Sequence, residues 1–183
     1  MSSESERRDR FMAISADVYG PLQRYLRRRV HPDDMGDLLG DVLVIVWRRL
    51  EDVPTDNPLP WCYGVARRTV SNHRRSTQRR LRLVERLEAE PAPDLFLDPA
   101  ESLSDPDLAD ALAALPAADR EIVRLWAWEQ LEPREIAQVL GSTSNAVSLR
   151  LTRAKRKLAD SLTRQDPPTS GQIGDRDTEE QRR

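Results

Sequence analysis

The sequence predicts an all-α protein built from two small helical domains, and three observations support this prediction. Apolar residues recur at spacings of three and four, which is the helical period, whereas the alternation typical of strands is hard to find. Glycine is limited to 7 of 183 residues. An acidic, proline-rich stretch at residues 89–106 has the composition of an extended linker and divides the helical pattern in two. We therefore expect two small hydrophobic cores.

The first domain is predicted over residues 11–88, after a polar N-terminus at residues 1–10 that we expect to be disordered. Two amphipathic segments open this domain. The first segment contains Pro21, which should kink its helix or divide it into two. We expect Asp33 or Asp34 to cap the second helix, because a short acidic side chain accepts hydrogen bonds from the first backbone N–H groups.

Charge is segregated along the chain, although the formal net charge is only −2. A third predicted helix begins near Trp61 and continues into a basic stretch that contains Arg67, Arg68, His73, Arg74, Arg75, Arg79, Arg80, Arg82 and Arg86. The linker reverses the sign, with acidic residues and neither lysine nor arginine. A basic helix is typical of nucleic-acid contact, whereas GC-rich codons would enrich arginine equally well.

The second domain is predicted over residues 107–163 and is followed by a disordered tail at 164–183. Within it, Leu131–Ala159 has the pattern of a helix-turn-helix. Pro133 suits the first turn of a helix, and Gly141 suits the left-handed conformation that ends one. The sequence therefore predicts a unit that reads DNA.

The first helix of this motif should turn Ile136, Ala137 and Leu140 inward, and Ser142 or Thr143 should cap the second helix. Val147, Leu151, Ala154 and Leu158 form the buried stripe of that second helix. The remaining side chains point outward, either as a solvated helix face or, as we favour, toward the major groove. Those predicted to contact DNA are Ser144, Asn145, Ser148, Leu149, Arg150, Thr152 and Arg153.

These blocks resemble those of the extracytoplasmic-function sigma factors, the small two-domain members of the bacterial RNA polymerase sigma family. In the first domain the resemblance lies in Asp37–Trp47, in Trp61–Arg68 and in Asn72–Arg75. In the second domain it lies in Leu115–Val123 and Ser148–Ala154. The order and spacing of the blocks make the match specific. The chain departs from the usual family pattern at Gly40, Leu43, Arg68 and Ser148.

The resemblance implies a factor that binds core RNA polymerase, recognises the −35 and −10 promoter elements and promotes DNA melting. It assigns polymerase contact to Asp37, Asp41 and Arg48. It assigns the −35 element to the outward residues of the second domain. It also implies an anti-sigma partner. Contact with the −10 element is assigned to Arg67, Arg68, Ser71, Asn72, His73, Arg74 and Arg75.

Two features of the sequence, the aromatic pair near residue 61 and the acidic linker, each allow two interpretations. Trp61 and Tyr63 either stack on unpaired bases or belong to the core, and for Trp61 we favour the core. The linker either mimics nucleic acid inside the polymerase or only tethers the domains in solution. Its carboxylates include Asp94, Asp98, Glu101 and Asp105.

The composition also limits the possible functions. Cys62 is the single cysteine, so no internal disulfide forms, and two distant histidines cannot complete a zinc-ligand pattern with it. We expect no enzyme activity, no metal, no cofactor and no small-molecule substrate. No apolar run approaches the ~20 residues that span a bilayer, and we expect a cytoplasmic protein, either free or held at the membrane by an anti-sigma partner. The alternative function is a helix-turn-helix regulator with an N-terminal sensing or interaction domain.

Overall fold

The computed structural model describes this chain over residues 2–85 and 105–165. Within these two ranges the regular structure is helical and contains no strand, which confirms the predicted all-α class. None of the helices in this part is both long and apolar enough to cross a membrane. The predicted linker lies outside the described residues except at its C-terminal end, and the predicted tail lies outside them beyond Gln165.

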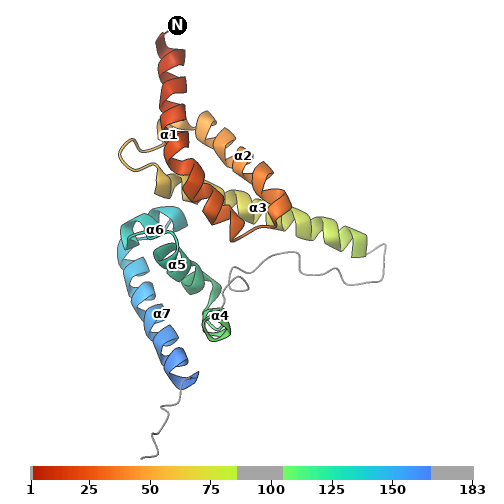
Figure 1. Cartoon of the computed structure of the whole chain (residues 1–183), viewed down its shortest axis with the longest axis vertical. Coiled ribbons are helices and arrows are strands. Elements are labelled where there is room, and N and C mark those ends of the chain that lie inside the picture. The colour runs from red at the N-terminus through yellow and green to blue at the C-terminus, as the bar shows by residue number, and fades with distance from the viewer. Residues whose placement is uncertain (1, 86–104, 166–183) are drawn as a thin grey trace, which may run out of the picture.

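The first domain is a bundle of three helices, each of which packs against the other two. They are α1 (Ser2–Arg27), α2 (Pro32–Arg48) and α3 (Leu59–Glu85), with a short 3₁₀ turn at Leu50–Asp52. In Figure 1, α3 passes behind α1 and extends beyond both α1 and α2 toward the right. The arginine-rich part of the sequence is therefore presented on a single long helix.

The N-terminus is helical, so the expectation of disorder is wrong for residues 2–10. Arg7 donates a hydrogen bond of 2.8 Å to the carbonyl oxygen of Trp47, and its guanidinium lies 4.9 Å from the centre of that ring. Arg10 donates to the carbonyl oxygen of Val53 at 2.9 Å. Polar composition alone suggested a solvated end, but these long-range contacts hold it against the first domain.

Two further local expectations need correction. Pro21 lies inside one continuous helix, so the expected division of this helix is wrong, whereas the alternative of a kink at Pro21 stays a prediction. The second helix is capped by His31, whose ring nitrogen lies 3.4 Å from the backbone nitrogen of Asp33. Asp33 and Asp34 instead occupy the first turn, where a carboxylate interacts favourably with the positive end of the helix dipole.

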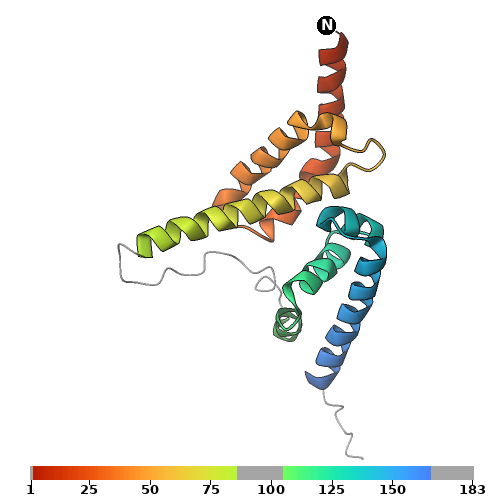
Figure 2. The same cartoon turned by 180° about the vertical axis from the view of Figure 1, so that it is seen from behind.

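The second domain consists of four helices, α4 (Pro106–Ala113), α5 (Ala117–Ala127), α6 (Pro133–Leu140) and α7 (Ser144–Gln165). Its long C-terminal helix, α7, packs against each of the other three, as Figure 2 shows from behind. At the start of α4, Asp105 Oδ1 accepts hydrogen bonds from the backbone N–H groups of Asp107 and Leu108 at 3.0 and 3.3 Å. This last linker carboxylate therefore has a defined structural role as a helix cap.

The buried apolar residues form one cluster that continues across both domains, rather than the two separate cores that we expected. The junction is a close packing of α3 on α6. Gly64 lies there, and a Cβ atom added to it would come 3.7 Å from the carbonyl oxygen of Val139. The absence of a side chain at residue 64 allows the two helix backbones to approach each other.

Candidate nucleic-acid and polymerase interface

The turn between α6 and α7 has the geometry that its sequence predicts. Gly141 ends α6 in the left-handed conformation, with φ 64° and ψ 43°. Thr143 Oγ1 accepts from the backbone N–H of Ala146 at 3.2 Å and so caps α7. The predicted Gly141 and Thr143 roles are therefore confirmed, and α7 begins with its N-terminal residues exposed.

The inward face of α6 differs in one residue from the prediction. Ile136 and Ala137 are buried as expected, but the third fully buried side chain is Val139, whereas Leu140 is half-buried. The difference arises because α6 packs against α3 as well as against its own domain. A helix that contacts two neighbours buries a wider face than one stripe, and the sequence does not reveal the second neighbour.

Most of the residues predicted to read the −35 element share the outer face of α7. Ser144, Asn145, Leu149, Thr152 and Arg153 are exposed, and Ser148 is half-buried. The opposite face holds the predicted buried stripe, of which Val147, Leu151 and Ala154 are buried. These predicted −35 residues therefore lie together on one face of α7, and their contact with DNA stays a prediction.

Arg150 differs from the rest of this set. Its Nε lies 2.7 Å from Asp119 Oδ1 on α5, so its guanidinium is engaged within the protein. The side chain of Asp119 is 20% exposed and that of Arg150 is 40% exposed. Arg153, by contrast, is exposed one turn further along the helix.

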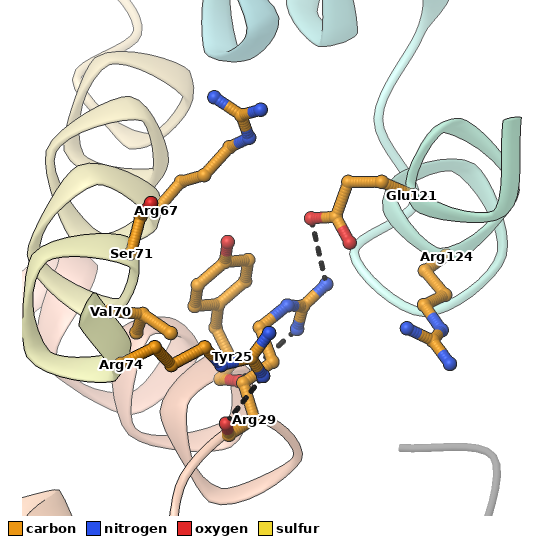
Figure 3. Close-up of a pocket in the computed structure, with 8 residues that line it drawn as sticks. All are labelled: Tyr25, Arg29, Arg67, Val70, Ser71, Arg74, Glu121 and Arg124. Atoms are coloured by element: carbon orange, nitrogen blue, oxygen red, sulfur yellow. Dashed lines mark hydrogen bonds and ion pairs between the residues drawn. The ribbon is translucent and has the colours of Figure 1, made fainter. Parts of the chain in front are cut away.

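The residues predicted to contact the −10 element all lie on α3 but on different faces of it. Arg67, Ser71 and Arg74 recur at helical spacing and line a cleft of about 220 Å³ between the domains, opposite Glu121 on α5 (Figure 3). Arg74 donates to the carbonyl oxygen of Arg29 at 2.9 Å. One part of the set therefore faces the second domain.

The rest of this set faces elsewhere. His73 Nε2 lies 3.3 Å from Asp34 Oδ2 at the start of α2, beside a groove between α2 and α3. Arg75 donates to Asn72 Oδ1 at 2.6 Å, and both residues are exposed. Arg68 is exposed as well. Arg67 and Ser71 are exposed too, although they line the cleft, so that His73 and Arg74 are the half-buried members of the predicted −10 set.

The predicted polymerase residues Asp37, Asp41 and Arg48 are exposed along one side of α2. The structure adds Val44, which is 48% exposed between them. Its position three residues after Asp41 and outside the apolar stripe was the sequence signal for this. The groove beside Val44 is lined by Leu38, Asp41, Val44, Ile45, Arg48, Thr69, Asn72, His73, Ser76 and Arg79.

The two aromatic residues at the start of α3 belong to the folded interior. Tyr63 is buried, and its hydroxyl donates to Glu129 Oε2 at 3.4 Å. Burial, aided by the nearby Glu129 carboxylate, raises the pKa of Tyr63. Trp61 is half-buried against the core, with the Arg49 guanidinium 5.4 Å from its ring. The core interpretation of Trp61 is confirmed.

A cluster that the sequence did not indicate lies between the domains. Arg29 donates from Nη1 to Glu129 Oε1 at 3.1 Å and from Nη2 to Glu121 Oε1 at 3.4 Å. The side chains of Arg29 and Glu129 are only 5% and 3% exposed. Burial alone would lower the pKa of Arg29. The interactions with Tyr25, Glu121 and Glu129 act in the opposite direction and are stronger together, so the net result is a raised pKa. Because these residues are about a hundred positions apart, no local pattern could pair them.

In the ranges 2–85 and 105–165, no group of three or more His, Cys, Asp or Glu side chains could hold a metal ion. Cys62 is a buried thiol, and burial raises its pKa to about 12. A thiol with so high a pKa is a poor nucleophile at neutral pH.

Comparison with protein families gives one match in each domain. Residues 14–80 match Sigma-70 region 2, and residues 107–158 match Sigma-70, region 4. Among individual proteins, the chain is 34% identical to the RNA polymerase sigma-E factor of Streptomyces avermitilis, over 76% of this chain and 78% of that protein. It is 28% identical to the RNA polymerase sigma factor SigV of Bacillus subtilis, over 73% of this chain and 79% of that protein.

Comparison with solved structures gives the same architecture. The chain resembles CnrH, solved in complex with the cytosolic domain of CnrY, with a TM-score of 0.57 and 25% identity over 85% of this chain and 89% of that one. It also resembles the fold of the sigma factor RpoE, solved in complex with the anti-sigma factor NepR from Bartonella quintana. That match has a TM-score of 0.60 and 21% identity over 84% of this chain and 96% of that one.

Proposed function

Because this chain belongs to the sigma-70 family of RNA polymerase sigma factors, in its extracytoplasmic-function group, we propose a division of promoter contacts between α7 and α3. As a sigma factor it directs core RNA polymerase to promoters. In our proposal α7 reads the −35 element, α3 holds and melts the −10 element, and α2 docks on polymerase. The observation that carries this proposal is the exposed polar face of α7 behind a correctly capped turn.

The start of α7 is suited to base edges in the major groove. Ser144 and Asn145 are exposed in its first turn, where hydroxyl and amide groups both donate and accept hydrogen bonds. Leu149 is 51% exposed in the next turn, and an apolar side chain there suits the methyl group of thymine. Arg153 lies beyond them and is placed to bind phosphate.

The −10 contacts follow from charge along α3. Phosphates must be held by cations while unpaired bases are kept apart, and α3 carries such cations on more than one of its faces. Arg68, Asn72 and Arg75 are exposed in the arrangement described above. Arg67 and Ser71 are exposed as well, at the cleft that faces the second domain.

For polymerase docking we propose the side of α2 that carries Asp37, Asp41, Val44 and Arg48. An exposed apolar residue inside a ring of charges is a common arrangement at protein interfaces, where the apolar centre is desolvated and the charged rim gives specificity. Val44 supplies this centre, and both signs of charge surround it. We also propose a cytoplasmic location, since a factor that acts with core polymerase on promoter DNA must share their compartment.

We further infer an anti-sigma partner. Two similar proteins of known structure were solved in complexes, one with the cytosolic domain of CnrY and one with the anti-sigma factor NepR. A partner that held both domains of this chain would prevent its use by polymerase. Titration of the purified chain with a candidate partner, followed by polymerase-binding assays, would test this inference, and undiminished polymerase binding would contradict it.

For the linker we propose that its carboxylates mimic nucleic acid inside polymerase until the transcript displaces them. The test is replacement of Asp94, Asp98 and Glu101 by the corresponding amides, which should change the yield of abortive transcripts. Asp105 is left intact because it caps α4. An unchanged abortive yield would favour a simple tether.

Run-off transcription tests the function as a whole. Core polymerase is supplied with linear fragments of genomic DNA, with and without the purified chain. Specific transcripts should depend on the chain, and Asn145→Ala should remove those with a matching −35 element. Thr163→Ala is the matched control, because Thr163 is also exposed on α7 but lies near its far end. Transcripts that form equally without the chain would overturn the proposal in favour of a regulator that acts without joining polymerase.

A further inference from the structure

The cleft drawn in Figure 3 lies between the two domains and has a predominantly basic lining. Among the described residues that line it are four arginines and one glutamate, Glu121. The volume of the cleft, about 220 Å³, is smaller than the ~300–1,000 Å³ of pockets that hold drug-sized ligands. The cleft is therefore suited to a small anion or to the charged group of a larger ligand.

The hydroxyl of Tyr25 lies at the bottom of this cleft. Tyr25 is only 1% exposed, and Figure 3 shows its hydroxyl pointing into the space between Arg67 and Glu121. Within residues 2–85 and 105–165 this hydroxyl makes no hydrogen bond, whereas the hydroxyl of the neighbouring Tyr63 donates to Glu129. Burial raises the pKa of Tyr25, so its hydroxyl keeps the proton at neutral pH. Because buried donors in folded proteins normally have an acceptor, this donor points to a ligand that supplies one.

Two arginines place positive charge beside this hydroxyl. The guanidinium carbon of Arg29 lies 3.6 Å from the centre of the Tyr25 ring. Arg67 is exposed, lines the same cleft and forms no ion pair in the described part of the chain. Ser71, one turn further along α3, adds a second hydroxyl to the lining. A ligand that binds here must therefore be an anion with several acceptor oxygens.

A second cleft adjoins the first one, because Arg67 and Glu121 line both. Its volume is about 530 Å³, which is within the usual range for organic ligands. Its wall is largely apolar and includes Ile122, Leu140 and Val147. A ligand with a charged group in the first cleft and an apolar part in the second would fill both.

We propose that these adjoining clefts bind a small organic phosphate, with its phosphate group on Tyr25, Arg67 and Ser71 and its apolar part in the second cleft. A phosphate group has three strong acceptor oxygens, which suit two hydroxyl donors and the two-pronged donor group of an arginine. Binding is measured on the free chain, so the proposal does not depend on the proposed function in transcription.

Glu121 sets an upper limit on the affinity of this site. Its carboxylate faces the cleft in Figure 3 and pairs with Arg29 at 3.4 Å. A phosphate beside it is repelled, because like charges at short distance disfavour each other. Glu121→Gln removes this repulsion and releases one nitrogen of Arg29 toward the ligand. This variant should therefore bind phosphate more tightly, a gain that damage to the fold does not produce.

Isothermal titration calorimetry of the full-length chain tests the site, with inorganic phosphate and phenyl phosphate as the two probes. Both should bind saturably, and phenyl phosphate should bind more tightly because its ring enters the apolar second cleft. Tyr25→Phe should weaken binding of both probes by about tenfold or more, because it removes a hydrogen bond to a charged group. Glu121→Gln should tighten binding of both.

The matched pair of arginine variants separates a defined site from general ionic attraction. Arg67→Ala should weaken phosphate binding strongly, whereas Arg68→Ala should leave it unchanged. The two variants remove the same charge from neighbouring exposed residues of α3, but Arg68 lines neither cleft. Equal losses in the two variants would indicate attraction to the basic helix as a whole and would overturn the site.

Urea unfolding checks that Tyr25→Phe acts through the ligand. Without phosphate the urea midpoint of this variant should match that of the unmodified chain, because the ring is kept and the lost hydroxyl has no partner in the described residues. Phenyl phosphate should raise the midpoint of the unmodified chain more than that of the variant, since a ligand that binds only the folded state stabilises it. Equal increases in the two proteins would overturn the role of this hydroxyl.

Three further outcomes would contradict the proposal. The absence of saturable binding at millimolar phenyl phosphate would overturn the site, and equal affinity for the two probes would overturn the assignment of the second cleft. A single-stranded oligonucleotide that displaces phenyl phosphate, and whose own binding Tyr25→Phe weakens as much, would assign this hydroxyl to a DNA phosphate instead. Loss of run-off transcription for the unmodified chain would overturn only the proposed function, because the calorimetry contains neither polymerase nor promoter.

Discussion

For single glycine residues in this chain, the effect of a substitution on stability depends more on the backbone conformation than on the space available for a side chain. Gly40 and Gly141 both have open space where a Cβ atom would be. Gly40 lies inside α2, where glycine leaves the unfolded chain more conformational freedom than alanine would. Gly141 has φ 64°, a conformation that a residue with a side chain rarely adopts. The same substitution should therefore have opposite effects at the two sites.

Gly40→Ala should raise the free energy of unfolding by about 1 kcal/mol, and Gly141→Ala should lower it by about 1 kcal/mol. Urea unfolding of the two variants, followed by circular dichroism, measures both changes. Each variant serves as the control for the other, since both add one methyl group to an open site. Changes of the same sign would contradict the explanation.

Three buried groups that ionise in the alkaline range should make the free energy of unfolding depend on pH in that range. Burial raises the pKa of the Cys62 thiol to about 12 and also raises those of the Tyr25 and Tyr63 hydroxyls. In the unfolded chain these groups ionise at ordinary values of about 8.5 and 10. Their neutral forms stabilise the folded chain fully below about pH 8, and this stability is lost as the pH rises toward the folded values.

We therefore expect the urea midpoint to be constant in neutral solution and to fall progressively above about pH 9. Absorbance of tyrosinate at 295 nm, recorded with and without urea, checks the assignment. Tyr25 and Tyr63 should contribute to this absorbance in the native chain only when it unfolds. Full titration of the tyrosines in the folded state near pH 10 would show that these hydroxyls are not held neutral.

At the scale of elements, α7 serves packing and recognition with opposite faces. Val147, Leu151 and Ala154 fix the helix within its domain, so the outer face is presented without movement of the backbone. Arg150 and Arg153 differ in their surroundings. Arg150 pairs with Asp119 of α5 at 2.7 Å, whereas Arg153 is exposed. An arginine already paired releases fewer counterions when DNA binds, because its charge is partly compensated beforehand.

Arg153→Ala should weaken DNA binding and reduce the slope of log affinity against log salt by about one. Arg150→Ala should reduce that slope by less. Fluorescence anisotropy of a labelled promoter fragment at several salt concentrations gives both slopes. A larger effect at Arg150 would mean that its pair with Asp119 breaks when DNA binds.

At the scale of the whole molecule, the two domains share one apolar cluster and one set of buried charges. Gly64 marks the point where they are closest, with its added Cβ 3.7 Å from the carbonyl oxygen of Val139. That distance is an ordinary van der Waals contact for a methyl group. A branched side chain at the same position would extend into the backbone of α6.

Gly64→Ala should leave the overall dimensions of the chain unchanged, whereas Gly64→Leu should separate the domains and increase the radius of gyration. Small-angle X-ray scattering of the full-length variants measures this difference. Circular dichroism should show equal helix content in both, since leucine and alanine are good helix formers. An unchanged radius for a folded Gly64→Leu would mean that the domains are not held together at this point.

Features that depend on near neighbours in the chain follow directly from the amino-acid sequence. Helical period, the left-handed turn at Gly141, the Thr143 cap and the faces of α7 all involve residues within a few positions of one another. Such interactions leave a local pattern. The family resemblance, which the comparisons confirm, rests on the same blocks.

Features that depend on distant partners are visible only in the folded chain. The helical N-terminus requires Trp47 to receive Arg7, and Arg150 is diverted from the DNA-reading face because Asp119 lies opposite it. Glu129 looks in sequence like any surface carboxylate. It becomes the centre of the cluster between the domains because packing brings cations from about a hundred residues away to a carboxylate that is only 3% exposed. Burial and charge partners are properties of the folded chain, and no local pattern records them.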